Sequence, residues 1–298
     1  MESNLPTTEL INHLSNNLDH LSTFEMLAII NQEDAKAVAA VQSVLTNIAA
    51  GVDRIADAFR SGGRLVYIGA GTSGRLGVLD ASECLPTFGV SPQMVFGIIA
   101  GGERALTRAI EGAEDDAAAG EQAIRDADIQ SVDVVVGISA SGGAPFVRAA
   151  LAEAKRRGAT TVGIANSQNA PLCADADIPI EAVVGPEVLQ GSTRMKSGTA
   201  QKLILNMLST GAMVRIGKTY GNRMVDVQCS NAKLVKRAQR LVADIGQVAD
   251  PAAAQIFLDA AGGSVKTAIV MARRGVDKST ADTLLRASDG FLSKVIDI

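Results

Sequence analysis

Three loops in the sequence combine glycines with side-chain hydroxyls, a composition that suits a phosphate group. They are "GAGTSG" (69–74), "SASGG" (139–143) and "GSTRMKSGT" (191–199). Each follows an apolar run and leads into a helical pattern, so its backbone N–H groups and the helix dipole favour an anion. The candidate binding residues for a phosphate ester are Gly71, Thr72, Ser73, Ser139, Ser141, Gly142, Ser192, Thr193 and Lys196.

The first loop also has the G-x-G-x-x-G spacing of a dinucleotide-binding fingerprint. That fingerprint needs an acidic residue at the end of the second strand to hold the ribose. Here the second apolar run, "MVFGIIAGG" (94–102), ends in Ala and Gly, and the next carboxylate is Glu103. The three loops therefore favour a small sugar phosphate over a dinucleotide. The plainer alternative is that these glycines only make tight turns.

Carboxylates are the candidates for acid–base chemistry because histidine is nearly absent. The chain has two histidines, His13 and His20, both within its first twenty residues. This argues against an imidazole metal site and against a Ser/His or Cys/His nucleophile pair, and leaves the work to other groups. Glu83 follows the first glycine loop, and Glu114 lies among small residues in "AIEGAEDD". Taken alone, each is also compatible with a solvated helix surface.

The composition is that of an ordinary globular protein. The 298 residues are 47% apolar and 20% charged, enough for one sizeable α/β domain with smaller appendages. A net charge of −4 with 3% aromatic residues disfavours a nucleic-acid partner. We expect no membrane span and no export, because the sequence has neither an 18-residue apolar run nor a signal-peptide pattern.

Cysteine usage bears on the compartment and on cofactors. Cys84, Cys173 and Cys229 are widely spaced and form no C-x-x-C motif. Unpaired cysteines without an export signal are typical of a reducing cytoplasm, where we expect this protein. With no cysteine cluster and two N-terminal histidines, we expect no metal.

Short apolar runs alternate with helical stretches through the middle of the chain. The runs are "RLVYI", "MVFGIIA", "DVVVGIS", "TTVGIA" and "IPIEAVV". This alternation predicts parallel β–α–β units in an α/β fold, with one doubly wound parallel sheet over residues 53–220. Residues 103–115 are predicted to be helical, and a long helix is predicted from about Ser197 to Val214. Ligands bind such sheets at the carboxyl ends of the strands, where the glycine loops lie.

Helices are predicted on either side of this sheet in the sequence. Residues 1–52 read as an N-terminal helical segment, in which Ser22 and Glu25 have the spacing of a capping box. Residues 248–298 read as a small C-terminal helical bundle. Its three helices are predicted to start at Asp250, Ser264 and Ser279.

Three long segments resemble the N-acetylmuramic acid 6-phosphate etherase family. They are "GAGTSGRLGVLDASECLPTFGV", "IAGGERALTRAIEGAEDD" and "GPEVLQGSTRMKSGTAQKLILNMLSTGAM". The third is also similar to a motif of the glucokinase regulatory protein, and the resemblance extends over nearly the whole chain. It implies a sugar-isomerase (SIS) domain, no metal or nicotinamide, and a homodimer with its sites near the interface.

The resemblance also implies a reaction. It is cleavage of the lactyl ether at C3 of N-acetylmuramic acid 6-phosphate, giving N-acetylglucosamine 6-phosphate and D-lactate. The catalytic glutamates of the family correspond to Glu83 and Glu114. In the open-chain sugar the C1 aldehyde acidifies the C2 proton, so a base can remove it while an acid protonates the departing ether oxygen. We assign Glu83 as the acid and Glu114 as a base acting at C2 or on water.

One position departs from the family, and two other functions share its fold. After "SASG" the family has Arg-Thr-Pro, whereas this sequence has Gly143, Ala144 and Pro145. An aldose–ketose isomerase would interconvert hexose phosphates and release no lactate. A sugar-phosphate-sensing regulatory protein would keep the phosphate loops but need neither glutamate. The presence of Glu83 and Glu114 within their motifs favours the etherase.

Overall fold

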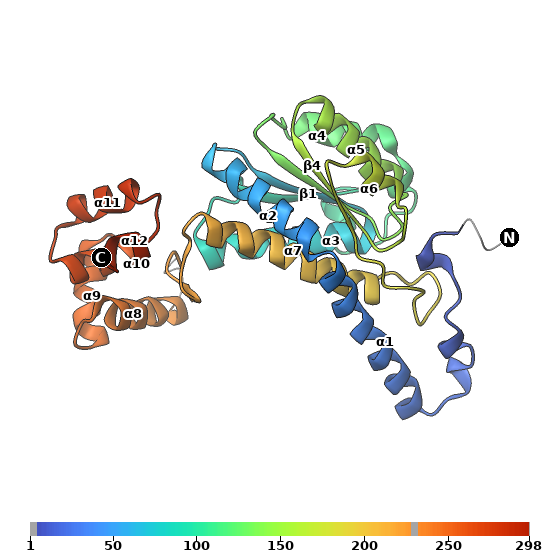
Figure 1. Cartoon of the computed structure of the whole chain (residues 1–298), viewed down its shortest axis with the longest axis horizontal. Helices are drawn as coiled ribbons and strands as arrows, with labels where there is room; N and C mark the ends of the chain where they lie inside the picture. The colour runs from blue at the N-terminus through green and yellow to red at the C-terminus, as the bar shows by residue number, and fades with distance from the viewer. Residues whose placement is uncertain (1–4, 228–231, 298) are drawn as a thin grey trace. The chain divides into compact units, whose positions relative to one another are not determined.

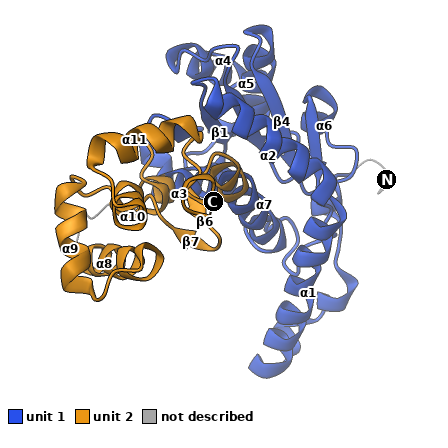
Figure 2. Ribbon diagram, turned by 60° about the vertical axis from the view of Figure 1, so that its left-hand side comes forward, with its two compact units in different colours: residues 1–81, 93–209 blue, residues 82–92, 210–298 orange. Residues whose placement is uncertain are grey.

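The chain forms two compact units in the computed structural model, which describes residues 5–227 and 232–297. The first unit comprises residues 1–81 and 93–209, and the second comprises residues 82–92 and 210–298 (Figure 2). The first unit thus includes both the N-terminal helical segment and most of the sheet region expected from the sequence. Cys229 lies outside the described residues.

A five-stranded parallel sheet forms the centre of the first unit and confirms the predicted α/β class (Figure 1). The strands are Leu65–Gly69 (β1), Val95–Ile99 (β2), Val134–Ile138 (β3), Thr160–Ala165 (β4) and Ile178–Glu181 (β5). Each coincides with one of the five apolar runs. β1 and β3 are buried along their whole length, as expected for strands covered by helices on both faces.

The strand order is β2-β1-β3-β4-β5, with every neighbouring pair parallel. After β1 the chain forms β2 on one side of β1, and then β3, β4 and β5 on the other side. The loops after β1 and β3 therefore diverge at a topological switch point. This is the place where open parallel sheets bind their ligands.

Helices cover both faces of the sheet (Figure 1). On one face lie Ala117–Asp126 (α4), Pro145–Arg156 (α5) and Pro171–Asp175 (α6), which share a core with Val66 and Ile68 of β1. On the other lie Leu45–Arg60 (α2) and the first parts of Gly71–Phe88 (α3) and Lys196–Arg215 (α7). Before them, Thr23–Ser43 (α1) starts at Ser22, where the predicted capping box with Glu25 is present.

No single helix among residues 5–227 and 232–297 is long and apolar enough to cross a membrane. The pair α1 and α2, bent by 61° at Val44, passes the same criteria of length and composition when taken together.

The stretch 103–115 is not the continuous helix that its composition predicts. It contains two short 3-10 turns, Glu103–Leu106 (η5) and Ala113–Asp115 (η6). Gly102 and Gly112 precede these turns with φ of 68° and 72°, and a right-handed α-helix cannot include a residue with such a positive φ. The α-helix α4 begins only after Asp116, whose side chain caps it by accepting a hydrogen bond from the Ala119 N–H.

The second unit contains a small hairpin, Thr219–Tyr220 (β6) and Arg223–Met224 (β7), and the last parts of α3 and α7. The further helices among its described residues are Ala232–Gly246 (α8), Pro251–Ala260 (α9), Val265–Arg274 (α10), Lys278–Ala287 (α11) and Ser293–Ile296 (α12). The caps at Asp250 and Ser264 agree with the sequence. The next helix starts earlier than predicted, because Asp277 caps it instead of Ser279.

Candidate active site

A cavity of about 400 Å³ lies at the switch point of the sheet in the first unit. Residues 70–73, after β1, form one of its walls, and Ile138 at the end of β3 together with residues 139–141 and 143–145 forms a second. Gly191 and Thr193 add a third wall. Parts of all three loops singled out in the sequence therefore meet at one cavity, although more than 40 residues of chain separate each loop from the next.

The first loop owes its shape to a close approach between strand and helix. A Cβ on Gly74 would lie 2.6 Å from the Gly69 carbonyl oxygen, and a Cβ on Gly69 would lie 2.7 Å from the Gly74 nitrogen. Only glycine allows this contact, so α3 starts directly at the end of β1. As a result Thr72 and Ser73 occupy the first turn of α3, at the helix end that favours an anion, and both line the cavity.

The second loop presents hydroxyls that are held by the backbone. Ser139 Oγ accepts a hydrogen bond from the Gly142 N–H at 3.1 Å, and Ser141 Oγ accepts one from the Gly143 N–H at 3.2 Å. Each hydroxyl keeps its own proton for donation to a ligand. Pro145 is the first residue of α5, which brings a second helix N-terminus to the cavity. Gly142 itself does not line the cavity; its φ of 73° makes the turn.

The third loop differs most from expectation at Lys196. This side chain is fully buried, and its Nζ donates to Glu33 Oε2 at 2.6 Å and to the Pro186 carbonyl at 2.7 Å. Glu187 accepts from the N–H groups of Lys196 and Ser197 at 3.0 and 2.9 Å and so caps α7. Lys196 is thus part of the core below the loop and does not line the cavity.

Ser192 also stays out of the cavity lining, which in this loop consists of Gly191 and Thr193. The cavity accordingly draws its donors from neutral groups. Of the described residues that line it, none is Lys or Arg. Hydroxyls, backbone N–H groups and two helix N-termini are what this site offers to a phosphate.

Three carboxylates line the same cavity, those of Glu9, Glu114 and Asp115. Glu114 belongs to the 3-10 turn η6 and is exposed. Glu114 lies in a motif that the sequence shows, whereas nothing in the sequence links Glu9, near the N-terminus, to a loop 60 residues further on. The sequence offers one indication that Asp115 belongs to the site, namely its position next to Glu114 in the acidic run.

Glu83 lies in α3 and is exposed, and it does not line this cavity. It follows Asp80 by three residues, about one helical turn. The buried Asp80 carboxylate accepts from Tyr67 Oη at 2.8 Å, from Asn206 Nδ2 at 2.6 Å and from Ser209 Oγ at 3.2 Å. These bonds fix the rotation of α3 about its axis just before Glu83.

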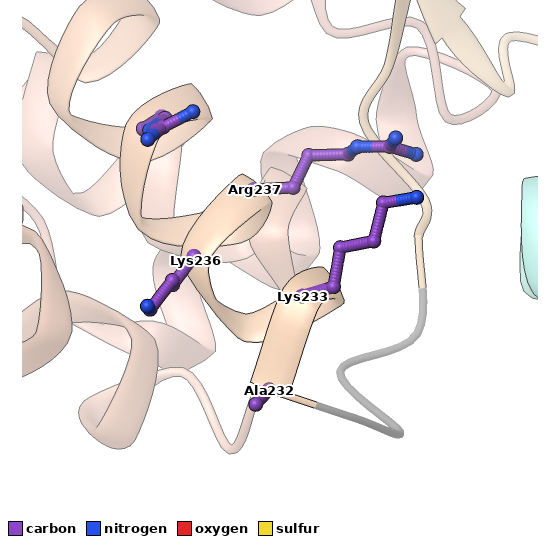
Figure 3. A pocket seen from close by; sticks show the side chains of 5 residues that line it. Ala232, Lys233, Lys236 and Arg237 are labelled. Carbon is purple, nitrogen blue, oxygen red and sulfur yellow. The ribbon is translucent and has the colours of Figure 1, made fainter.

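A second cavity, of about 470 Å³, lies beside α8 in the second unit (Figure 3). Its lining is Ala232, Lys233, Lys236, Arg237 and Arg240. Lys233 and Arg237 extend from the helix in the same direction (Figure 3). The sequence predicts no site in this part of the chain.

The chain matches two domain families. Residues 47–155 match the glucokinase regulatory protein N-terminal SIS domain, and residues 116–210 match the SIS domain. Among solved structures, phosphoheptose isomerase GmhA from Neisseria gonorrhoeae is similar with a TM-score of 0.50 and 17% identity. The match covers 64% of this chain and 98% of that one and supports the fold.

Relatives with established names match nearly the whole chain. An N-acetylmuramic acid 6-phosphate etherase of Aeromonas hydrophila is 53% identical, with 96% of each chain covered. One from Glaesserella parasuis is 54% identical over 96% of this chain and 94% of its own. N-acetylmuramic acid 6-phosphate etherase 2 of Lactiplantibacillus plantarum is 51% identical over 98% of both. This chain therefore belongs to the N-acetylmuramic acid 6-phosphate etherase family.

Proposed function

We propose that this protein cleaves the lactyl ether of N-acetylmuramic acid 6-phosphate and so acts as a carbon–oxygen lyase in the recycling of cell-wall amino sugars. One observation carries the proposal beyond family membership. A single cavity joins the N-termini of α3 and α5 and the hydroxyls of the first two loops, which suit the 6-phosphate, with Glu114. The products are N-acetylglucosamine 6-phosphate and D-lactate.

The reaction we propose is elimination followed by hydration. A carboxylate, assigned to Glu114, takes the C2 proton of the open-chain sugar, and the electron pair of that bond forms the C2=C3 double bond. The C3–O bond breaks as a second carboxyl group protonates the ether oxygen, and D-lactate leaves. We assign this group to Glu83 from its family motif and not from the cavity, whose lining does not include it. Water then adds at C3 and a proton returns to C2. Each acid–base group contributes a factor of roughly 10²–10⁴ to the rate.

We further propose a cytoplasmic homodimer with no nucleic-acid or membrane partner. The two described cysteines, Cys84 and Cys173, are buried and not in a disulfide, as expected in a reducing compartment. Burial raises the pKa of the Cys173 thiol to about 12, so this thiol is an unreactive part of the core. Light scattering of the purified protein measures the oligomeric state.

The proposed phosphate contacts predict a loss of affinity in two serine variants. Ser73→Ala and Ser141→Ala should each weaken substrate binding roughly 10- to 150-fold, because a hydrogen bond to a charged group contributes about 1.5–3 kcal/mol. The control is Ser61→Ala, an exposed serine at the end of α2, which should leave affinity unchanged. If unphosphorylated N-acetylmuramic acid binds as well as its 6-phosphate, these loops do not hold the phosphate.

The absence of a basic residue from the described lining predicts a gain of affinity at Gly143. A Cβ there would meet only Ser141 Oγ, at 3.5 Å, so Gly143→Arg is sterically allowed. A guanidinium at this exposed edge should lower KM about 3-fold, within the range for exposed ion pairs. Gly143→Gln has similar bulk without the charge and should leave KM unchanged. An arginine variant with a KM above that of the wild type would show that the phosphate binds elsewhere.

The proposed function is tested by incubating the purified protein with N-acetylmuramic acid 6-phosphate and measuring D-lactate. We expect lactate and N-acetylglucosamine 6-phosphate in equal amounts. Conversion of hexose phosphates without lactate would identify an isomerase. Binding of a sugar phosphate without turnover would identify a sensor.

A further inference from the structure

Glu9 brings a carboxylate from the N-terminal segment to the cavity, and the reaction scheme gives it no role. It is the last residue of the 3-10 helix Thr7–Glu9 (η2). Glu9 Oε2 lies 3.4 Å from the position that a Cβ would take on Gly191, so the carboxylate rests against the third loop. Within residues 5–227 and 232–297, the Glu9 side chain has no hydrogen bond or ion pair. Both of its oxygens are thus available to a ligand.

The backbone around Glu9 is tied to the loop that precedes α7. The Glu9 carbonyl accepts a hydrogen bond from Gln190 Nε2 at 2.8 Å, next to Gly191. Further along the same segment, Ser15 Oγ donates to the Val188 carbonyl at 2.7 Å. Residues 9–15 therefore run alongside residues 188–190. These hydrogen bonds hold the backbone of Glu9 next to the cavity.

The anchor of this segment is a buried polar network. Asn12 is 8% exposed, and its Nδ2 donates to Glu33 Oε2 at 2.9 Å and to the Pro186 carbonyl at 3.2 Å. The same two acceptors bind Lys196 Nζ. Asn12 and Lys196 thus share their partners, and the ion pair under the third loop also fixes the N-terminal segment. Leaving any of these buried groups unpaired is costly, so the arrangement is well defined.

Charge decides which part of a substrate Glu9 can meet. A carboxylate only accepts hydrogen bonds, and a phosphate dianion has none to donate, so the two repel each other. The ring hydroxyls and the acetamide N–H of an amino sugar are donors. With the phosphate at the helix N-termini of α3 and α5, Glu9 is left to face the sugar.

We propose that Glu9 is a substrate-binding residue that accepts hydrogen bonds from the sugar's hydroxyl or acetamide groups, and that residues 7–15 are part of the binding site. The inference rests on the proposed function, because it takes an amino-sugar phosphate as the ligand. It makes recognition of the sugar depend on a segment far in sequence from the sheet.

The test compares two ligands on the full-length protein by titration calorimetry. N-acetylglucosamine 6-phosphate reports on sugar and phosphate together, whereas inorganic phosphate reports on the phosphate loops alone. Glu9→Ala should weaken binding of the sugar phosphate at least about 10-fold, as expected for a hydrogen bond to a charged group. It should leave inorganic phosphate bound equally well or more tightly, because a nearby negative charge is removed. In turnover assays KM should rise while kcat stays within about 3-fold.

Two variants complete the design. Glu9→Gln keeps one acceptor oxygen and should lose less affinity than Glu9→Ala. Asp19→Ala removes an exposed carboxylate from the same N-terminal segment and should change nothing. Unchanged affinity of Glu9→Ala for the sugar phosphate would overturn the proposal. So would an equal loss for both ligands, which indicates a structural role. If the wild type binds neither ligand and releases no lactate, the proposed function itself fails.

Discussion

Replacing Glu114 with Gln should lower kcat at least about 100-fold, because the amide can neither take the C2 proton nor return it. Glu114 is exposed in a 3-10 turn at the cavity, so an isosteric amide should leave the fold and the thermal unfolding temperature unchanged. Glu83→Gln should have an effect of the same order, since protonation of the ether oxygen is equally necessary. Initial rates of D-lactate release at saturating substrate measure both.

The control for these variants is Glu121→Gln on α4, a partly exposed glutamate paired with Arg125. It should retain the wild-type rate. Near wild-type turnover in both Glu83→Gln and Glu114→Gln would exclude the two-carboxylate mechanism. A large loss in only one would mean that water or another residue supplies the second proton transfer.

The second large effect concerns stability. Lys196→Met should lower the free energy of unfolding by about 3 kcal/mol, because removing one partner of a buried ion pair leaves the other charge without compensation. Both side chains of the Lys196–Glu33 pair are 0% exposed. The unfolding temperature should fall by about 6–12 °C in a domain of this size. Lys202→Met, an exposed lysine on the same helix, should stay within about 0.5 kcal/mol of the wild type.

The effect of Lys196→Met should depend on pH. Burial by itself raises the pKa of Glu33, but hydrogen bonds from Lys196 and Lys36 outweigh it and hold the pKa below its usual range. A carboxyl with a lowered pKa in the folded state contributes stability above its unfolded pKa of about 4.3. That contribution disappears as the pH falls through the folded-state pKa. Denaturant unfolding should therefore show a smaller difference between variant and wild type below about pH 4 than at pH 7. A difference that does not change with pH would contradict this account of the pair.

Local pattern was sufficient for the sheet and for the loops at its edge. Five apolar runs became five strands, because strands buried on both faces need continuous apolar sequence. Glycines that allow a close backbone contact, such as Gly69 and Gly74, then fixed where α3 begins. The strand order, which local pattern does not predict, places the switch point between β1 and β3, where the first two hydroxyl-bearing loops lie.

The positions of Lys196 and Glu9 could not be predicted from the sequence, because they depend on partners far along the chain. Lys196 belongs to a glycine-containing sequence segment that predicts an anion contact, yet it is the first residue of α7 and its partner is Glu33, 163 residues away in α1. The same holds for Glu9, whose segment is held at the cavity by hydrogen bonds of Asn12 and Ser15 to Glu33, Pro186 and Val188, all far along the chain. The helix predicted for residues 103–115 was wrong for a local reason. Gly112 has a left-handed conformation, which the spacing of apolar residues does not reveal.

The reaction path is tested most directly by running the reaction in water labelled with deuterium and ¹⁸O. If cleavage is elimination followed by hydration, the C2 proton is lost to a carboxylate that exchanges with solvent, and the C3 oxygen comes from water. We predict N-acetylglucosamine 6-phosphate with deuterium at C2 and ¹⁸O at C3, together with D-lactate that keeps the original ether oxygen. Product that retains its original C2 hydrogen, or lactate that carries the ¹⁸O label, would contradict the mechanism.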